Sequence, residues 1–349
     1  MRIIDMHCDT IMGLMHSNAE LRKNDHMIDL DKLQKGDYLL QCFAMFVPYV
    51  SKDNKENYSP FEMCNKMIDR YYLEIEQNKD LIAPAFTYED IENNIKNNKM
   101  TALLTIEEGG VCLGNIEFLR NFYRLGVRMM TLTWNFKNEI ATPNIDYFSV
   151  TREQIQKEGF KVNTTDGLTE FGIEVVKEMN RLGMVIDCSH LGDKGFYDVI
   201  KYSTKPIVCS HSNARSVCNH PRNMTDDMLL KLKENGGVVG INYCHDFIKE
   251  EKTVATVKDI VKHIDHIKSL IGIDHIGLGS DFDGIGNADL ELKDASMMHL
   301  LLDELKASVN IDKLEKLNSL TYRTDKHGTI ILTSDGENIS FETIQTNTN

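Results

Sequence analysis

The stretch LTEFGIEVVKEMNRLGMVIDCSH, residues 168–190, shows the pattern that decides the fold. Its first part, 168–182, has apolar residues at helical spacing, and Gly183 stands where that helix should end. The next five residues, 184–188, form a short and mostly apolar run. A run without polar alternation is typical of a strand buried on both faces, as in a parallel sheet covered by helices. The stretch therefore predicts a helix that leads into a buried parallel strand.

The same alternation of apolar runs and helical segments continues along the whole chain. Runs that predict strands cover residues 2–6, 39–47, 101–106, 127–133, 184–188, 206–210, 237–241 and 273–279. Segments with helical periodicity cover residues 61–77, 88–97, 116–125, 168–182, 225–234, 256–271 and 297–306. Eight strands that alternate with helices predict an α/β fold of the (β/α)8 TIM-barrel type, with an open doubly wound sheet as the alternative.

The predicted barrel accounts for residues 1–317 as one domain, because α/β barrels run past about 250 residues without a split. The remaining segment, 318–349, is rich in Thr, Ser and Asn and forms a small C-terminal extension. Two apolar runs, 329–333 and 339–344, flank Asp335-Gly336 and predict a β-hairpin. A disordered polar end is the alternative.

Composition limits the classes of partner. The net charge of −14 disfavours nucleic acid and anionic membrane, because both reward clustered Lys and Arg. No apolar run reaches the roughly 18 residues that span a bilayer, and the start, MRIID, lacks a signal-peptide stretch, so we expect a cytoplasmic protein. The eight cysteines include no CxxC pair and are expected to be reduced thiols. A small-molecule substrate fits this composition best.

Metal-binding residue types follow the predicted strands, at the end of a barrel where catalytic groups project. His7 and Asp9 end the first run; two positions apart, they point to the same face and can converge on one cation. Taken alone, such a pair is more often a packed histidine and a helix-capping aspartate than a metal site. Glu107 and Glu108 end the third run before two glycines, and one of these carboxylates could bridge two metals.

The later strands end in the same chemistry. His190 and His211 follow the fifth and sixth runs, and imidazoles on neighbouring strands, about 4.8 Å apart, can reach one ion. Asp281 follows the eighth run in the stretch SDFDG, where it can act as general acid or base beside a metal-bound water. A calcium-binding turn is the alternative, although the rest of an EF-hand loop is missing. The set of imidazoles and carboxylates predicts a site for zinc, manganese or iron.

With these residues in place, the chain resembles the membrane (renal-type) dipeptidase family, peptidase family M19, and within it the bacterial cytosolic branch. The resemblance runs from about residue 3 to residue 284. Seven ordered pieces carry it: His7-Cys8-Asp9-Thr10, Thr105-Ile106-Glu107, Phe122-Tyr123-Arg124-Leu125-Gly126-Val127-Arg128, Ile186-Asp187-Cys188-Ser189-His190, Ser210-His211-Ser212, Arg222-Asn223 and Gly279-Ser280-Asp281-Phe282-Asp283-Gly284.

The resemblance implies a binuclear zinc site and the hydrolysis of dipeptides by a metal-bridging hydroxide. His7 and Asp9 would hold one zinc, His190 and His211 the second, and the glutamate after the third run would bridge them. Counting back from Phe122-Tyr123-Arg124 without a gap places that bridge at Glu107. Glu108 remains the alternative, because it adjoins the glycines that often follow the family's glutamate.

The resemblance also implies residues that handle the substrate. Arg222 would bind the terminal carboxylate of the dipeptide, and Asp281 would move a proton from the attacking water to the leaving amine. Trp134 follows the fourth run where animal members carry a substrate-binding histidine, and it is either a core residue or a wall of the substrate pocket. Family members often pair into homodimers through outer helices, and the sequence itself neither shows nor excludes such a dimer.

Two other functions are consistent with the same residue types. Another two-metal barrel amidohydrolase could act on a cyclic amide or ester, but such enzymes commonly carry an HxH pair and a carboxylated lysine, where this chain has His7-Cys8-Asp9 and Glu107. A non-catalytic metal-binding protein would not need Asp281. A turnover assay with added metal separates these alternatives.

Overall fold

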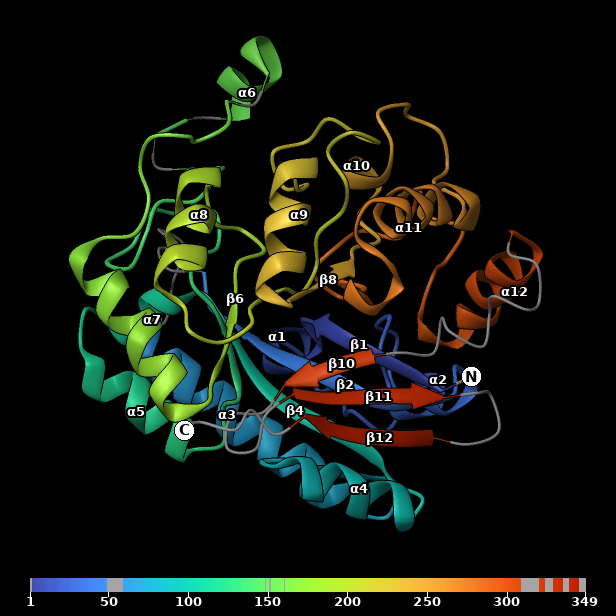
Figure 1. Cartoon of the computed structure of the whole chain (residues 1–349). Helices are drawn as coiled ribbons and strands as arrows, with labels where there is room; N and C mark the ends of the chain where they lie inside the picture. The colour runs from blue at the N-terminus through green and yellow to red at the C-terminus, as the bar shows by residue number, and fades with distance from the viewer. Residues whose placement is uncertain are drawn as a thin grey trace.

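The barrel predicted from the apolar runs is present in the computed structural model, which describes residues 2–48, 59–147, 149–150, 152–159, 161–308, 320–323, 329–334 and 339–344. Its eight parallel strands, in order around the ring, are β1 (Ile3–Cys8), β2 (Tyr38–Phe46), β4 (Met100–Glu107), β5 (Met129–Thr131), β6 (Val185–Asp187), β7 (Val208–Cys209), β8 (Val238–Ile241) and β9 (Ile276–Leu278). β9 pairs with β1, and β2 pairs with β4, so the sheet closes on itself. The open sheet is thereby excluded (Figure 1).

A ninth parallel strand, β3 (Ile82–Pro84), pairs with the first residues of β4 outside the ring. The apolar runs did not predict it, because three residues are too few to establish a period. The strands predicted at 127–133, 206–210 and 273–279 are shorter in the structure than their apolar runs. The outer residues after β5, β7 and β9 belong to the turns that carry the site. Those before β5 and β7 belong to connecting loops, and those before β9 to a short 3-10 turn, η2 (Ile273–His275).

Helices cover the outside of the barrel, and each of α5, α7, α8, α9, α11 and α12 contacts the next one in this series. The helices are α1 (Thr10–Met15), α2 (Leu30–Lys35), α3 (Pro60–Gln77), α4 (Tyr88–Lys96), α5 (Ile116–Arg124), α6 (Arg152–Glu158), α7 (Glu170–Leu182), α8 (Asp193–Tyr202), α9 (Asp226–Asn235), α10 (His245–Ile248), α11 (Val257–Ile271) and α12 (Met298–Ser308). α6 projects from the body of the molecule (Figure 1).

Local sequence explains where the main helices begin and end. Thr225 caps α9 by accepting a hydrogen bond from the backbone N–H of Met228, and Gly236 ends the helix with φ of 75°. Gly183 ends α7 in the same left-handed conformation. α8 has neither signal, because its N-cap, Gly192, offers no side chain, and the sequence pattern missed this helix.

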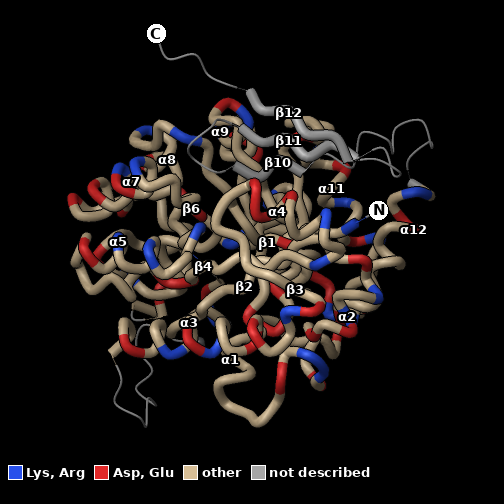
Figure 2. The backbone as a smooth tube through the Cα atoms, turned by 90° about the horizontal axis from the view of Figure 1, so that it is seen from below, with Lys and Arg blue, Asp and Glu red and all other residues tan. Residues whose placement is uncertain are grey.

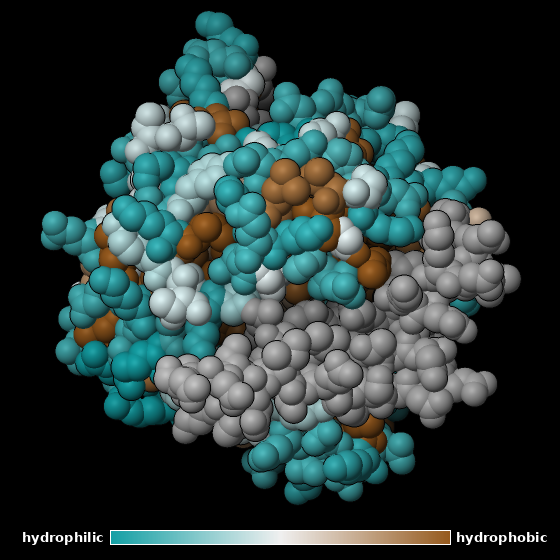
Figure 3. Space-filling view, viewed as in Figure 1, coloured by the Kyte–Doolittle hydropathy of each residue, from teal (hydrophilic) through white to brown (hydrophobic). Residues whose placement is uncertain are grey.

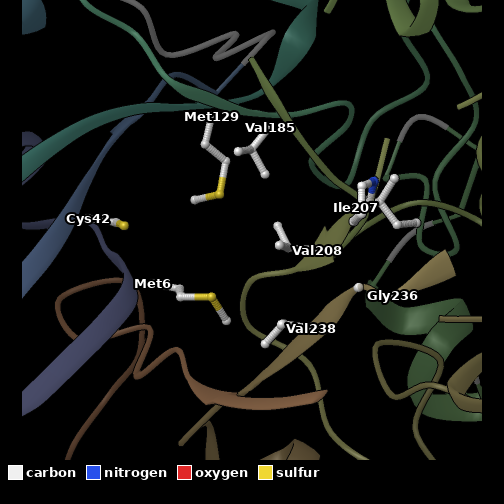
Figure 4. Close-up of a pocket in the computed structure, with 10 residues that line it drawn as sticks. Met6, Cys42, Met129, Val185, Ile207, Val208, Gly236 and Val238 are labelled. Atoms are coloured by element: carbon white, nitrogen blue, oxygen red, sulfur yellow. The ribbon is translucent and has the colours of Figure 1, made fainter. Parts of the chain in front are cut away.

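Apolar side chains from several strands fill the barrel at its N-terminal end. Ile4 and Leu103 belong to a buried cluster there. An apolar pocket lies beside it, and its strand-borne walls are Met6, Cys42, Met129, Val185, Val208 and Val238 (Figure 4). Four of these residues, Met129, Val185, Val208 and Val238, are the first residues of β5, β6, β7 and β8, whereas the predicted metal ligands lie at the strand ends. The barrel therefore separates a packed apolar end from a polar end.

The C-terminal segment forms a three-stranded antiparallel sheet of β10 (Leu320–Arg323), β11 (Thr329–Ser334) and β12 (Ile339–Ile344). β11 and β12 pair as a hairpin with Ser334 opposite Ile339, and the predicted Asp335-Gly336 turn lies outside the described residues. β10 was not predicted. It lies near η2 and β9, at the N-terminal end of the barrel.

The described surface is mixed in character. Lys and Arg alternate with Asp and Glu over the helices that surround the strands (Figure 2). The face in Figure 3 is mainly hydrophilic, with scattered apolar patches between the helices. Among the described residues, no helix combines the length and the apolar character needed to cross a membrane.

Candidate metal centre

Two of the predicted ligands lie on strands that are separated only by β2, and they meet over the C-terminal end of the barrel. His7 is on β1, Glu107 is the last residue of β4, and both side chains are buried. His7 Nε2 is 3.2 Å from Glu107 Oε2. β2, between β1 and β4, pairs with both strands and sets this juxtaposition.

The two histidines from the opposite side of the ring face the other oxygen of the same carboxylate. His190 and His211 follow β6 and β7, and their Nε2 atoms lie 3.0 Å apart. Glu107 Oε1 is 2.9 Å from His190 Nε2 and 3.5 Å from His211 Nε2. Glu107 thus presents one oxygen to each group of histidines, which is the arrangement a bridging carboxylate needs.

Two aspartates complete the cluster beside His7. Asp9 Oδ2 and Asp281 Oδ1 lie 3.6 Å and 3.9 Å from His7 Nε2. Asn242 donates a hydrogen bond of 2.9 Å to Asp281 Oδ2 and holds that carboxylate in place. Gly284 makes room for both acids, since a Cβ there would lie 2.1 Å from Asp9 Oδ2 and 2.5 Å from Asp281 Oδ1.

Unpaired polar atoms show that this cluster fits a cation. Within the described part of the chain, His7 Nε2 and Asp9 Oδ1 are buried and make no hydrogen bond. His7 Nε2 and Glu107 Oε2 lie 3.2 Å apart without forming a hydrogen bond. Buried polar atoms without partners are costly. Two potential ligand groups, His7-Glu107-His211 and His7-Asp9-Asp281, hold their atoms within 4.8 Å of one another, and a metal between them would satisfy these atoms.

Electrostatics favour a positive ion at the same place. Burial raises the pKa of Glu107 to about 8, and the negative charge of Asp9 adds to the effect. Burial, followed by the positive charge of Arg222, lowers the pKa of His190 well below its usual value. Burial and neighbouring cationic groups do the same for His211. His190 and His211 are therefore neutral. Burial opposes a positive charge on His7 too, but the negative charges of Glu107 and Asp9 outweigh it and raise the pKa of His7 well above its usual value. The carboxylates thus attract positive charge at the place where a metal ion would bind.

Arg222 lies beside the histidines, and two of its side-chain nitrogens are available as hydrogen-bond donors. Its side chain is buried, and one terminal nitrogen, Nη2, lies 3.0 Å from His190 Nε2 and 3.3 Å from the backbone oxygen of His211. Among the described residues, its Nε and Nη1 have no hydrogen-bond partner. The guanidinium also lies over the ring of Phe247, 5.3 Å from its centre. A buried, planar guanidinium with available N–H donors is suited to binding a carboxylate.

Trp134 lies at the edge of the site and not in the core. It is half-buried, and its ring centre is 6.2 Å from that of His190. Phe46 packs against it edge-on at 5.0 Å, and Tyr147 lies at 5.9 Å. These three aromatic rings form one wall beside the histidines, as expected for the side of a substrate pocket.

Comparison with known proteins identifies the family. The model of the family described as membrane dipeptidase (peptidase family M19) matches residues 1–321. The chain belongs to this family. This confirms the resemblance that the seven sequence motifs indicated.

Individual relatives of this membrane dipeptidase family member agree with that assignment. An uncharacterized dipeptidase of Schizosaccharomyces pombe is 33% identical over 281 residues, which are 77% of this chain and 63% of the relative. Dipeptidase 3 of Mus musculus is 34% identical and covers 79% of this chain, which spans 52% of its length. The chain thus spans between about half and two thirds of these relatives.

A solved structure shares the fold of this membrane dipeptidase family member. It is a metallopeptidase from Rhodobacter sphaeroides liganded with a phosphinate mimic of the dipeptide L-Ala-D-Ala. It matches with a TM-score of 0.77 and 23% identity, covering 89% of this chain and 93% of that one. The barrel is therefore the fold of an experimentally determined metallopeptidase.

Glu107 and Glu108, the two candidates for the bridging carboxylate, have different surroundings in this membrane dipeptidase family member. Glu107 faces the histidines, whereas Glu108 turns into the loop after β5. Glu108 accepts hydrogen bonds from the backbone N–H groups of Trp134, at 2.8 Å, and Gly110, at 2.7 Å, and from the side chain of Asn138. Burial raises the pKa of Glu108 to about 7. Glu108 therefore supports the wall that contains Trp134.

Sequence reasoning missed several polar residues around the candidate ligands of this membrane dipeptidase family member. Asn135 Oδ1 lies 2.9 Å from His190 Nδ1, Ser210 Oγ lies 2.7 Å from His211 Nδ1, and Asn242 holds Asp281. No spacing in the sequence marks Asn242 or Asn135. The serine was visible, because Ser precedes His after two successive strands, but its role depends on contacts between those strands.

Proposed function

We propose that the chain is a metallodipeptidase that hydrolyses the peptide bond of dipeptides with two divalent metal ions, most simply Zn²⁺. The observation that carries this proposal is the placement of Glu107, whose two carboxylate oxygens face His7 on one side and the His190–His211 pair on the other. Membership of the membrane dipeptidase family supports the same activity.

The five proposed ligands can be divided between two metal ions. His7 and Asp9 would hold one and His190 and His211 the other, with Glu107 shared. Five ligands are more than one tetrahedral zinc takes, and imidazole with carboxylate and no thiolate is typical of catalytic zinc. When bound, such ions lower the pKa of a coordinated water toward neutrality and polarise the scissile carbonyl.

Asp281 is proposed to take up the proton of the attacking water and return it to the leaving amine. Burial raises its pKa to about 6, which lies close to the pH at which a general acid-base group works best. Asn242 binds Oδ2 and leaves Oδ1 directed toward His7. The carboxylate is thus oriented with one oxygen toward the proposed metal site.

Arg222 is proposed to bind the terminal carboxylate of the substrate with its free Nε and Nη1 donors. A buried guanidinium beside the metal ligands favours a carboxylate only one residue beyond the cleaved bond, so dipeptides fit and longer peptides do not. The aromatic wall at Trp134 would contact a substrate side chain.

A substrate panel tests this function. Metal-loaded protein should hydrolyse free dipeptides, and the corresponding dipeptide amides and tripeptides should react on the order of 10²-fold more slowly, because they lack the carboxylate at the position of Arg222. Arg222→Gln should reduce this discrimination. Turnover of cyclic amides or esters with none of dipeptides would favour the rival amidohydrolase, and metal binding without any turnover would favour a binding protein.

The domain division is proposed as well: the catalytic barrel is assigned to residues 1–317, and residues 318–349 to an extension that supplies no ligand. The proposed ligands and Asp281 all precede that boundary.

A further inference from the structure

A fully buried carboxylate, Asp187 at the end of β6, lies beneath the histidine pair and belongs to none of the proposed catalytic roles. Its Oδ1 accepts hydrogen bonds from Ser189 N at 3.1 Å, Ser189 Oγ at 2.6 Å and Ser210 N at 2.8 Å. Its Oδ2 accepts from Thr131 Oγ1 and Ser210 Oγ, both at 2.6 Å. Five donors converge on one carboxylate, which is the coordination expected of its ionised form.

Counting protons in this network fixes the state of His211. An ionised carboxylate only accepts, so the single hydroxyl proton of Ser210 points to Asp187. Ser210 Oγ is also 2.7 Å from His211 Nδ1. With its own proton committed, the hydroxyl can only accept in that second contact. His211 must therefore carry its proton on Nδ1, and its Nε2 keeps a free lone pair.

The free Nε2 is the atom that faces the proposed metal. It lies 3.5 Å from Glu107 Oε1 and 3.0 Å from His190 Nε2. A second contact holds the backbone of the same residue, because His211 N donates to Ser189 Oγ at 3.1 Å, and that hydroxyl is itself bound to Asp187. Asp187 thus controls both the position of His211 and the placement of its proton.

We propose that Asp187 is a positioning residue that fixes His211, through the hydroxyl of Ser210, in the tautomer able to bind metal. The inference rests on the proposed metal site. It assigns a role to a residue that contacts neither metal nor substrate. Residues that orient metal-ligating histidines in this way typically change metal affinity by about 10- to 100-fold when they are replaced.

The opposite side of the barrel provides an internal comparison. Asp5 accepts hydrogen bonds from Ser280 N at 2.8 Å and Ser280 Oγ at 2.6 Å, the distances seen for Asp187 and Ser210. Ser280 precedes Asp281, however, and its hydroxyl contacts the backbone oxygen of His7 at 3.2 Å instead of a ring nitrogen. The same pair of hydrogen bonds from serine to aspartate therefore occurs twice, but only the serine bound to Asp187 contacts a histidine ring nitrogen.

Replacement of the carboxylate by an amide should invert the proton order. In Asp187→Asn, an amide N–H in place of Oδ2 would donate to Ser210 Oγ, the hydroxyl would then donate to His211 Nδ1, and the ring proton would move to Nε2. Ser210→Ala removes the acceptor for Nδ1 without changing the charge. Thr131→Val is the matched control, because it removes a 2.6 Å hydrogen bond to the same Asp187 oxygen but leaves Ser210 and His211 untouched.

Zinc affinity of the full-length protein, measured by competition with a chromophoric chelator, tests the proposal. Asp187→Asn and Ser210→Ala should bind zinc about 10- to 100-fold more weakly than wild type, and Thr131→Val should stay within about threefold. Nitrogen NMR of the histidine rings in chelator-treated protein, with the His211 signals assigned through His211→Gln, should show the proton on Nδ1 in wild type and on Nε2 in Asp187→Asn.

Three results would overturn the inference: wild type with the His211 proton on Nε2, Asp187→Asn with unchanged zinc affinity, or Thr131→Val weakened as much as Asp187→Asn. If Asp187→Asn does not fold, Ser210→Ala and the wild-type spectrum still decide the matter. A wild-type protein that binds no zinc would overturn the proposed function instead, and the tautomer measurement, made without metal, would separate the two failures.

Discussion

His190 and His211 place their Nε2 atoms 3.0 Å apart at the ends of two adjacent strands. Neither atom has a proton to share, if His190 donates its Nδ1 proton to Asn135 and His211 donates its own to Ser210. Two lone pairs held this close repel each other unless positive charge offsets them. Arg222 Nη2 lies 3.0 Å from His190 Nε2 and faces one of them, and a cation between the histidines and Glu107 would face both. The two imidazole nitrogens are therefore placed to bind a cation together.

The two neighbouring glutamates give a matched test of the bridge. Glu107→Gln should lower the zinc content from about two ions per chain to one or fewer, because an amide cannot offer two anionic oxygens. Glu108→Gln makes the same chemical change one residue later and should keep both ions while losing about 1 to 3 kcal/mol of unfolding free energy. Elemental analysis with denaturant unfolding measures both. Equal zinc loss in the two variants would remove the bridging role from Glu107.

Asp281→Asn should lower turnover by a factor on the order of 10² to 10⁴ while the metal content stays nearly unchanged. Asp283→Asn is the control. Asp283 accepts hydrogen bonds from Thr10 Oγ1 and Met27 N, each at 2.6 Å, and so holds the loop structurally. That variant should lose stability and retain turnover. Metal loss in Asp281→Asn would make Asp281 a ligand, and unchanged turnover would exclude it from the mechanism.

His263 should make the protein less stable in acid. The buried ring accepts a hydrogen bond from Ala214 N at Nδ1 and donates from Nε2 to Ile248 O, and burial lowers its pKa from 6.5 to about 4. As the pH falls, this histidine is therefore protonated in the unfolded chain before it is protonated in the folded protein. Its contribution to the free energy of unfolding is fully present above about pH 6.5 and declines as the pH falls toward 4.

In numbers, the loss of unfolding free energy between pH 7.5 and pH 5 should be about 2 kcal/mol smaller in His263→Gln than in wild type. Denaturant unfolding of chelator-treated protein at the two pH values measures this difference. An identical pH dependence in the two proteins would show that His263 is not held neutral by the fold.

Removal of residues 318–349 should leave the zinc content unchanged, since the proposed ligands all precede this segment. β10 lies near β9 and η2, however, so the truncation should expose barrel surface and increase aggregation. Metal analysis and light scattering measure the two effects. A soluble truncated protein that no longer holds two ions would show that the C-terminal sheet supports the site.

The sequence predicted the eight barrel strands because each is buried on both faces and therefore appears as a continuous apolar run. It indicated the candidate ligands because His7, His190 and His211 stand within two residues after such runs. It could not choose between Glu107 and Glu108, because adjacent residues at a strand end point to opposite sides and the exact end of β4 is not encoded in a pattern. Contacts such as Asp187 with Ser210 depend on strand neighbours, so only the folded barrel shows them.

The most direct test of the account is a zinc titration of chelator-stripped protein in which the hydrolysis of a free dipeptide, such as alanylalanine, is followed at each addition. Hydrolysis should be absent without metal and should reach its maximum at about two zinc ions per chain, because the proposed site divides its five ligands between two ions. Hydrolysis that saturates at one ion, or a protein that binds two ions and leaves the dipeptide intact, would contradict the proposed function.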